Sequence, residues 1–172
     1  MRFLATQAIQ VSLRAAVAAG LAYWVARLLH ADYAIYALVG AIIVTDLSPA
    51  MTRRLGWQRM AGTLIGAFAG AVLLHVLPIG PIALGVAILA SMLLTYLLRL
   101  EPSAARVAGY VAAIVMLAYR ADPWHYAFAR AWETLLGIGA AQLVGLVPLW
   151  LREREGEPAP ETKRPRVKRG RE

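Results

Sequence analysis

A run of small residues inside an apolar block is the feature on which the fold prediction depends. Residues 59–74 read RMAGTLIGAFAGAVLL, so an arginine opens the block and glycines and a threonine stand where leucine is usual. Residues 130–144, RAWETLLGIGAAQLV, follow the same pattern. An offset of 71 residues aligns Arg59 with Arg130, Thr63 with Thr134, and Gly66 with Gly137. The chain therefore carries one unusual segment twice.

The composition of the chain indicates a membrane protein. Of its 172 residues, 60% are hydrophobic and 16% are charged, whereas soluble domains average about half apolar and about a quarter charged. The apolar residues stand in long blocks separated by short loops, which is typical of transmembrane helices in series. A soluble helical bundle is the alternative, but its helices would keep a polar face that most of these blocks lack.

We predict an all-α membrane domain over residues 1–151 and a separate tail over residues 152–172. Six transmembrane helices are expected near residues 8–29, 33–47, 59–77, 82–98, 104–119 and 124–151. Residues 46–58, DLSPAMTRRLGWQ, are expected to form a loop because they include several charged and polar side chains. The first block is too long for a cleavable signal peptide and lacks its small-residue cleavage pattern.

The arginines of the loops predict the orientation, because Lys and Arg favour the cytoplasmic side. With both termini inside, the cytoplasmic side holds the basic tail and Arg2, Arg53, Arg54, Arg59, Arg99 and Arg106. The outer side then holds Arg27, Arg120 and Arg130. We therefore expect a multi-pass protein of the inner membrane with cytoplasmic N and C termini.

The doubled segment predicts a repeat of three helices. Residues 28–30, LLH, match residues 97–99, LLR, and Gly40 in the second expected helix matches Gly109 in the fifth. Because three is odd, the second copy must enter the membrane from the opposite side, which gives two inverted three-helix repeats. The second and fifth helices are the shortest, and such pairs point to a transport site near the midplane. The alternative is that short helices simply tilt less.

The doubled segment also places its small residues on one helix face. Arg59, Thr63, Gly66 and Gly70 are spaced 4, 3 and 4 residues apart, and the second copy repeats the stripe. Small residues at this spacing let helix backbones approach closely in a membrane. Helix packing is therefore expected at Gly62, Gly66, Gly70 and Gly137. The hydroxyls of Thr63 and Thr134 are expected to bond across that interface or back to their own helices.

The two arginines have two interpretations. A cation in the hydrocarbon costs at least about 2.5 kcal/mol, so it needs a partner, water or the membrane interface. Arg59 and Arg130 stand near the starts of their expected helices and could extend to the lipid headgroups. Alternatively, they attract an anion into a path between the repeats. Glu133 is then either a structural partner of Arg130 or a proton carrier. Asp46 is likewise either a proton carrier or the partner of Arg53, Arg54 or Arg59 in a loop salt bridge.

The sequence holds no pattern typical of an enzyme. It has no cysteine, which excludes disulfides and thiolate sites. His75 and His125 lack the spacing of a metal site, and no phosphate-binding loop or nucleophile motif is present. We therefore predict no catalytic residues, no metal and no cofactor.

The tail is expected to be disordered, because it has few apolar residues to bury. Residues 152–172 contain eight Arg or Lys and five Glu. Its cluster KRPRVKRGR is the kind that contacts anionic cytoplasmic lipid. Nucleic-acid binding is the rival interpretation and is not favoured for a segment attached to a membrane bundle.

Several of these segments together resemble one known family. Residues 53–70, RRLGWQRMAGTLIGAFAG, resemble the signature of the aromatic acid exporter, or fusaric acid resistance-like (FUSC), membrane proteins. Residues 12–29, SLRAAVAAGLAYWVARLL, and 130–147, RAWETLLGIGAAQLVGLV, are similar to the first and sixth helices of that unit. The resemblance covers about residues 8–151. It implies that the family's motif positions correspond here to two sets of residues: Arg59, Gly62, Thr63, Gly66 and Gly70, and Arg130, Thr134 and Gly137.

The resemblance implies a six-helix inner-membrane unit that exports aromatic carboxylates. Typical members join it to a cytoplasmic domain and often to a second membrane unit, which these 172 residues do not include, so a homodimer is expected. The functional prediction is outward transport of an organic anion without an ATPase of its own. Arg59, Thr63, Arg130, Thr134, Glu133 and Asp46 are its candidate residues, and the lipid bilayer and the anion its expected partners. The alternative is a membrane subunit or scaffold that docks a partner protein and does not transport.

Overall fold

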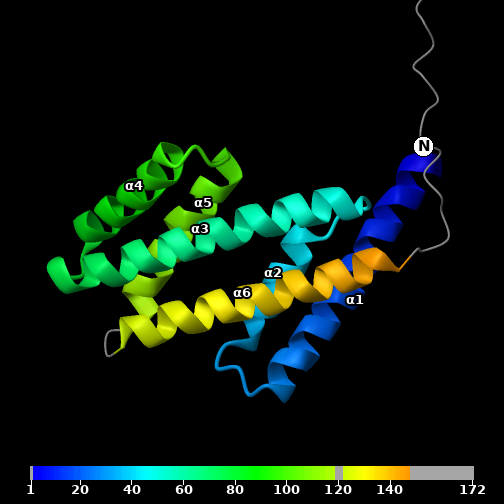
Figure 1. Ribbon diagram of the computed structural model, residues 1–172, viewed down its shortest axis with the longest axis horizontal. Helices are drawn as coiled ribbons and strands as arrows, with labels where there is room; N and C mark the ends of the chain where they lie inside the picture. Colours follow the sequence, from blue (N-terminus) through cyan, green and yellow to red (C-terminus); the bar gives the residue numbers. More distant parts are fainter. Residues whose placement is uncertain (1, 119–121, 148–172) are drawn as a thin grey trace, which may run out of the picture.

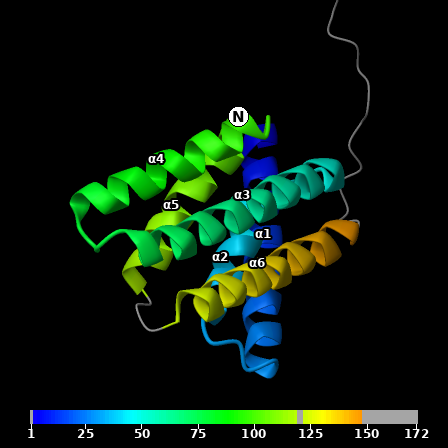
Figure 2. The same cartoon turned by 60° about the vertical axis from the view of Figure 1, so that its left-hand side comes forward.

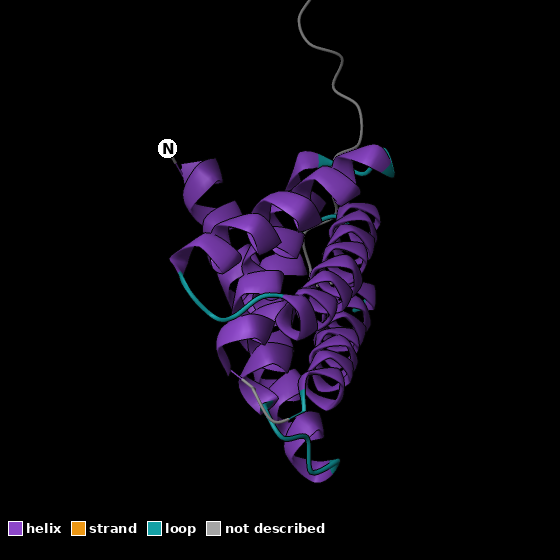
Figure 3. Cartoon of the chain, turned by 90° about the vertical axis from the view of Figure 1, so that its left-hand side faces the viewer, coloured by secondary structure: helices purple, strands orange, loops and turns teal. Residues whose placement is uncertain are grey.

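The computed structural model describes residues 2–118 and 122–147, with side chains from Thr6 onward. Within these ranges every regular element is an α-helix (Figure 3). The helices are α1 (Arg2–Leu28), α2 (Ala34–Val44), α3 (Pro49–Val76), α4 (Pro81–Leu97), α5 (Pro102–Ala118) and α6 (Pro123–Leu146). The all-α prediction is thus confirmed for this part of the chain. The predicted basic tail lies outside the described residues.

The expected loop over residues 46–58 is wrong, because α3 begins at Pro49. Ser48 precedes the helix and proline occupies its first turn, where the missing N–H costs no hydrogen bond. The turn before it is closed by the N–H of Ser48, which donates to Asp46 Oδ1 at 3.0 Å. The sequence predicts a loop because this part of it contains charged residues such as Arg53, which in fact belong to the first turns of α3. As a consequence, Arg59 lies well inside α3 and not at its beginning.

The helices differ in their capacity to cross a membrane. Thr6–Leu28 and Pro49–Val76 are the two helical segments of the described chain that are long and apolar enough to do so by length and composition. The helix α2 has 11 residues, and about 1.5 Å of rise per residue makes it too short for a hydrocarbon core of about 30 Å. The helices α4 and α5 are apolar and have 17 residues each.

The two longest central helices lie side by side. Figures 1 and 2 show α3 and α6 adjacent and running in opposite directions, with α2 and α5 crossing behind them. The helices α1 and α4 lie on opposite sides of this centre (Figure 1). Each of the short helices α2 and α5 packs against the long helix of the other half of the chain, α6 and α3 respectively.

The interior is made of small residues and the surface of large apolar ones. Alanine dominates the buried clusters, for example Ala37 and Ala41 in α2 and Ala108 and Ala112 in α5. In contrast, Ile82 is 84% and Phe128 74% exposed. An apolar exterior around a core that also contains charged side chains is the distribution expected in lipid, where helices associate through close packing.

Glycines set the distance between α3 and α5. A Cβ on Gly62 would lie 2.5 Å from the carbonyl oxygen of Ala104, and one on Gly70 would lie 2.7 Å from that of Ala112. A Cβ on Gly66 would overlap the carbonyl oxygen of Ala108, and one on Gly137 in α6 would overlap that of Ala37 in α2. The two backbones of each pair are therefore in direct contact.

The helices α1 and α4 end in the same way. His30 and Arg99 adopt φ of 53° and 57°, in the left-handed region that is unusual for residues other than glycine. The N–H of Ala31 then donates to Ala26 O, and that of Leu100 to Thr95 O, the long hydrogen bond of a Schellman motif. The matching sequences LLH and LLR thus form matching helix ends.

Candidate functional site

Both arginines of the doubled segment lie inside the bundle. Arg59 on α3 is 3% exposed and Arg130 on α6 is 1% exposed. The interpretation in which these side chains extend to the lipid headgroups is therefore wrong. Arg59 lies ten residues after the first residue of α3, so more than two turns of this helix precede it.

Arg59 is held by a tyrosine of α5. Its Nη1 donates to the hydroxyl of Tyr110 at 2.7 Å. Its Nε is buried and makes no hydrogen bond to the described residues. Gly40 of α2 is a neighbour of this Nε: a Cβ there would make ordinary van der Waals contacts, 3.7 Å from the Nε and 3.6 Å from the Cα of Gly137. The Arg59 head group thus lies beside the glycine contact of α2 with α6.

Arg130 is held by an aromatic ring of α2. Its Cζ lies 3.3 Å from the centroid of the Tyr36 ring, the geometry of a cation–π interaction. The hydroxyl of Tyr36 is 2.9 Å from that of Tyr126, one turn before Arg130 on α6. The ring of Tyr33 meets that of Tyr126 edge-on at 5.0 Å. Nε and Nη1 of Arg130 are buried without a hydrogen-bond partner among the described residues.

Glu133 joins α6 to the start of α2. Its Oε1 accepts a hydrogen bond from the backbone N–H of Tyr33 at 2.5 Å, and Tyr33 is the residue that precedes α2. Its Oε2 is buried without a partner in the described chain. Although Glu133 and Arg130 lie one turn apart, the ion pairs between described residues are Arg54–Glu101 and His125–Asp32. Neither buried arginine therefore forms a close ion pair with a described carboxylate, although Arg130 and Glu133 interact electrostatically at longer range.

The other candidate residues separate into two groups. Thr63 and Thr134 are buried on the same faces as the arginines, and the hydroxyl of Thr63 has no described partner. Asp46 lies in the turn before α3, where its backbone N–H donates to Thr52 Oγ1 at 3.0 Å and its carboxylate accepts from Ser48. Within the described chain it makes no ion pair with Arg53, Arg54 or Arg59.

The site is rich in donors that lack acceptors. The guanidinium groups of Arg59 and Arg130 and the hydroxyl of Thr63 are buried donors without a described partner. The buried acceptor without a described partner at this site is Oε2 of Glu133. Leaving such groups unpaired costs about 1–3 kcal/mol each, and more for charged groups. An anion with several acceptor atoms is the chemical species that satisfies such a set, and guanidinium matches a carboxylate in particular.

The comparison with known proteins agrees with this picture. A family model described as fusaric acid resistance protein-like matches residues 21–144, which is more than half of the chain. The chain belongs to the fusaric acid resistance protein-like family. No curated protein and no solved structure matches it. Membership and the apolar helices identify a membrane protein, and the family is of the transport or resistance type.

The tyrosines are the part of this family member's site that the sequence analysis missed. Tyr33 and Tyr36 precede and open the short helix α2, Tyr110 lies in α5, and Tyr126 stands four residues before Arg130. The four-residue spacing of Tyr126 and Arg130 was a visible signal, because it places both on one face of a helix. The other three depend on which helices pack together.

A third buried arginine, Arg14, links α1 to the segment that follows α2. Arg14 of α1 donates from Nη1 to the carbonyl oxygen of Leu47 at 2.6 Å, just after α2 ends. A cation beside the exposed carbonyls of a helix C-terminus is favourable. Among the described residues, no group of three His, Asp or Glu side chains is placed to hold a metal ion.

Proposed function

We propose that this member of the fusaric acid resistance protein-like family is a transporter of the inner membrane that moves organic anions, of the aromatic carboxylate class, outward. The single observation that carries the proposal is the pair of buried arginines with unpaired N–H groups and no described carboxylate partner. Arg59 and Arg130 bind the carboxylate, and Tyr36, Tyr110 and Tyr126 supply aromatic surface beside it. Thr63 and Thr134 line the same faces.

The proposed topology is two inverted three-helix repeats with cytoplasmic N and C termini. Contacts that correspond in the two halves support it. Gly66 meets Ala108 as Gly137 meets Ala37, and members of each pair are 71 residues from their counterparts. The chain functions as a homodimer without an ATPase and without enzymatic activity, and its basic tail contacts anionic lipid. Glu133 is the proposed proton partner, whereas Asp46 serves the turn that starts α3.

The test is flux of a radiolabelled aromatic carboxylate into or out of proteoliposomes that contain the full chain. We expect R59Q and R130Q each to reduce the initial rate at least about tenfold, because removing a charge-assisted hydrogen bond costs about 1.5–3 kcal/mol. The matched control is R54Q, which removes an exposed arginine from the same helix as Arg59 and should retain the rate.

Unchanged flux in both buried-arginine variants would refute the proposed site. A protein that shows no anion flux but co-purifies with a stable partner would instead support the second candidate, a membrane scaffold. That candidate has in its favour only the exposed apolar surface of the described helices, which lipid explains equally well.

A further inference from the structure

Two contacts between helices correspond to each other but are built from different chemistry. We define the α3–α5 junction by Gly62, Ala104, Arg54 and Glu101, and the α2–α6 junction by Glu133, Tyr33, His125 and Asp32. Gly62 and Glu133 are 71 residues apart, and so are Ala104 and Tyr33, and Arg54 and His125. Each junction joins the first half of a long helix to the start of the short helix from the other half of the chain.

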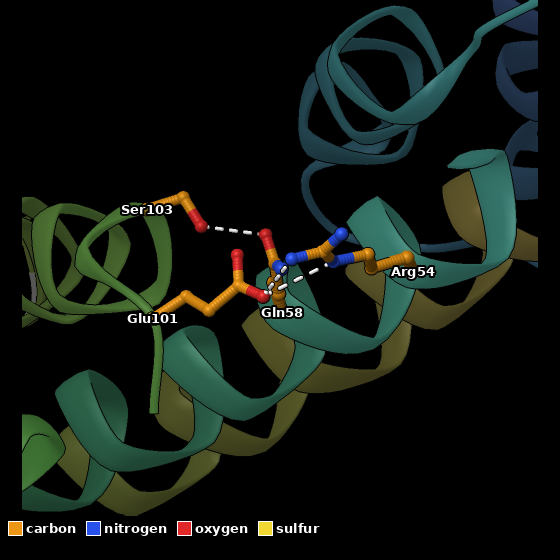
Figure 4. Close-up of polar contacts among 4 residues, drawn as sticks. All are labelled: Arg54, Gln58, Glu101 and Ser103. Carbon is orange, nitrogen blue, oxygen red and sulfur yellow. Dashed lines mark hydrogen bonds and ion pairs between the residues drawn. The ribbon is translucent and has the colours of Figure 1, made fainter. Parts of the chain in front are cut away.

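The α3–α5 junction contains no buried titratable group among these residues. Gly62 lies against the backbone of Ala104 so closely that a Cβ would not fit. Figure 4 shows the polar contacts beside it, where Arg54 donates to Glu101 at 3.0 Å from Nε and Ser103 donates to Gln58. The arginine keeps its charge at all physiological pH values. This junction is therefore held by the close backbone contact at Gly62 and by the hydrogen bond of the permanently charged Arg54.

The α2–α6 junction has a carboxylate where the other junction has glycine. Glu133 is 1% exposed, and its side chain spans the gap to the N–H of Tyr33. The ionised carboxylate is the stronger acceptor for this N–H. However, burial of a charge without an ion-pair partner is costly, and a proton removes that cost. The same side chain thus has two states that hold the start of α2 with different strength.

We propose that Glu133 is a proton-controlled latch between α6 and α2, and that the α3–α5 junction stays closed while this one opens. Ionised Glu133 holds the N–H of Tyr33 strongly and protonated Glu133 holds it more weakly, so protonation increases the population in which the start of α2 is separated from α6. The inference deepens the proposed transport function, because it assigns the proton-dependent opening to one side of the bundle. In the proposed orientation this is the outer side.

Other charged and titratable groups surround the latch. Two of them, Arg130 and Tyr126, lie on α6 together with Glu133. The loop before α2 and α2 itself contribute Asp32, Tyr33 and Tyr36, while α3 contributes Arg59 and α5 contributes Tyr110. The exposed pair of His125 and Asp32, 3.8 Å apart, is the other contact at this junction that depends on a proton. The effect of a proton there is opposite to its effect on Glu133, because protonation of His125 strengthens the pair. The two groups can therefore be separated experimentally.

The test measures distances between spin labels in the full chain in lipid nanodiscs, with no anion added. The sequence has no cysteine, so introduced pairs are the only labelling sites. One pair, I35C and F128C, reports on α2 and α6, and a reference pair, W57C and R106C, reports on α3 and α5. All four positions are exposed. The pH is lowered from about 8 to about 5, where an ordinary exposed carboxyl stays ionised.

We expect the 35–128 pair to gain a longer-distance population at low pH and the 57–106 pair to stay constant. E133Q, which imitates the protonated carboxyl, should show the longer population at both pH values, and H125Q should retain the pH response. Three outcomes would overturn the proposal. They are a pH response of the 35–128 pair that persists in E133Q, no pH response of this pair when Glu133 is present, and an equal response of the 57–106 pair. Because no anion is present, loss of flux in R59Q and R130Q tests the transport function separately.

Discussion

The junction of α3 with α5 and the junction of α2 with α6 occupy corresponding places in the bundle, yet they hold their helices differently. In the first, three glycines of α3 lie directly on alanines of α5. In the second, Gly137 makes one such contact, and the side chains of Glu133 and Arg130 fill the remaining space against Tyr33 and Tyr36. The comparison shows that a backbone contact fixes a distance, whereas a side-chain contact permits alternatives.

The largest effect is expected from adding one methyl group at a glycine contact. G66A and G137A each force a Cβ into a backbone carbonyl. Overpacking costs about 1–3 kcal/mol and occasionally more, and we expect the upper end or beyond here because the overlapped atoms are backbone atoms that cannot move aside. We expect both variants to unfold at a clearly lower temperature in detergent, measured by circular dichroism. The matched control is G139A, which places its Cβ in open space on α6 and should be stabilised by about 0.5–1 kcal/mol. Equal melting temperatures for G66A and G139A would show that the close contact does not hold α3 to α5.

A second comparison removes one hydroxyl from each arginine partner. Y110F leaves the Nη1 of Arg59 without its acceptor and should cost about 1.5–3 kcal/mol, because a hydrogen bond to a buried charge is lost. Y36F keeps the ring beneath Arg130 and loses only the bond to Tyr126, at about 0.5–1.5 kcal/mol. Thermal unfolding should therefore rank Y110F below Y36F. Equal melting temperatures would indicate that the two arginines are held alike, and the reverse order would show that the Tyr36 hydroxyl contributes more than the Tyr110 hydroxyl.

The smallest effect is expected at the exposed polar contacts of the α3–α5 junction. E101Q removes the ion pair with Arg54, whose two side chains are largely exposed, and such pairs contribute about 0–1 kcal/mol. We expect the melting temperature to change little and to lose its weak dependence on salt concentration. A large loss of stability would mean that the polar contacts, and not the glycines, close this junction.

Length and apolarity were sufficient to place most of the helices from the sequence. The blocks between polar loops correspond to α1, α2, α4, α5 and α6. The largest difference among their starts is at α1, which begins at Arg2, six residues before the expected start at residue 8. The failure at residues 46–58 has a physical reason, since Arg54 and Gln58 are polar residues of α3 that bond to Glu101 and Ser103 at the start of α5. Ser48 followed by Pro49 was a helix-start signal that outweighed those charges.

The candidate site was predictable only in part, for a different reason. The arginines stood out because a cation in an apolar block requires an explanation. Their partners did not, because the sequence does not state that α5 brings Tyr110 to Arg59 or that α2 brings Tyr36 to Arg130. The repeat alignment paired Gly40 with Gly109, whereas Gly40 faces α6 and Gly109 faces Met92 of α4. The inverted topology itself stays a prediction.

The alanine-rich interior has a consequence for how this protein tolerates mutation. In a water-soluble protein the largest buried side chains are the least replaceable, because their loss leaves cavities. Here the largest apolar side chains point outward, and exchanging one for another changes little. The intolerant positions in a saturation library should be the glycines and alanines between helices, so the map of forbidden substitutions would trace the smallest residues in the chain.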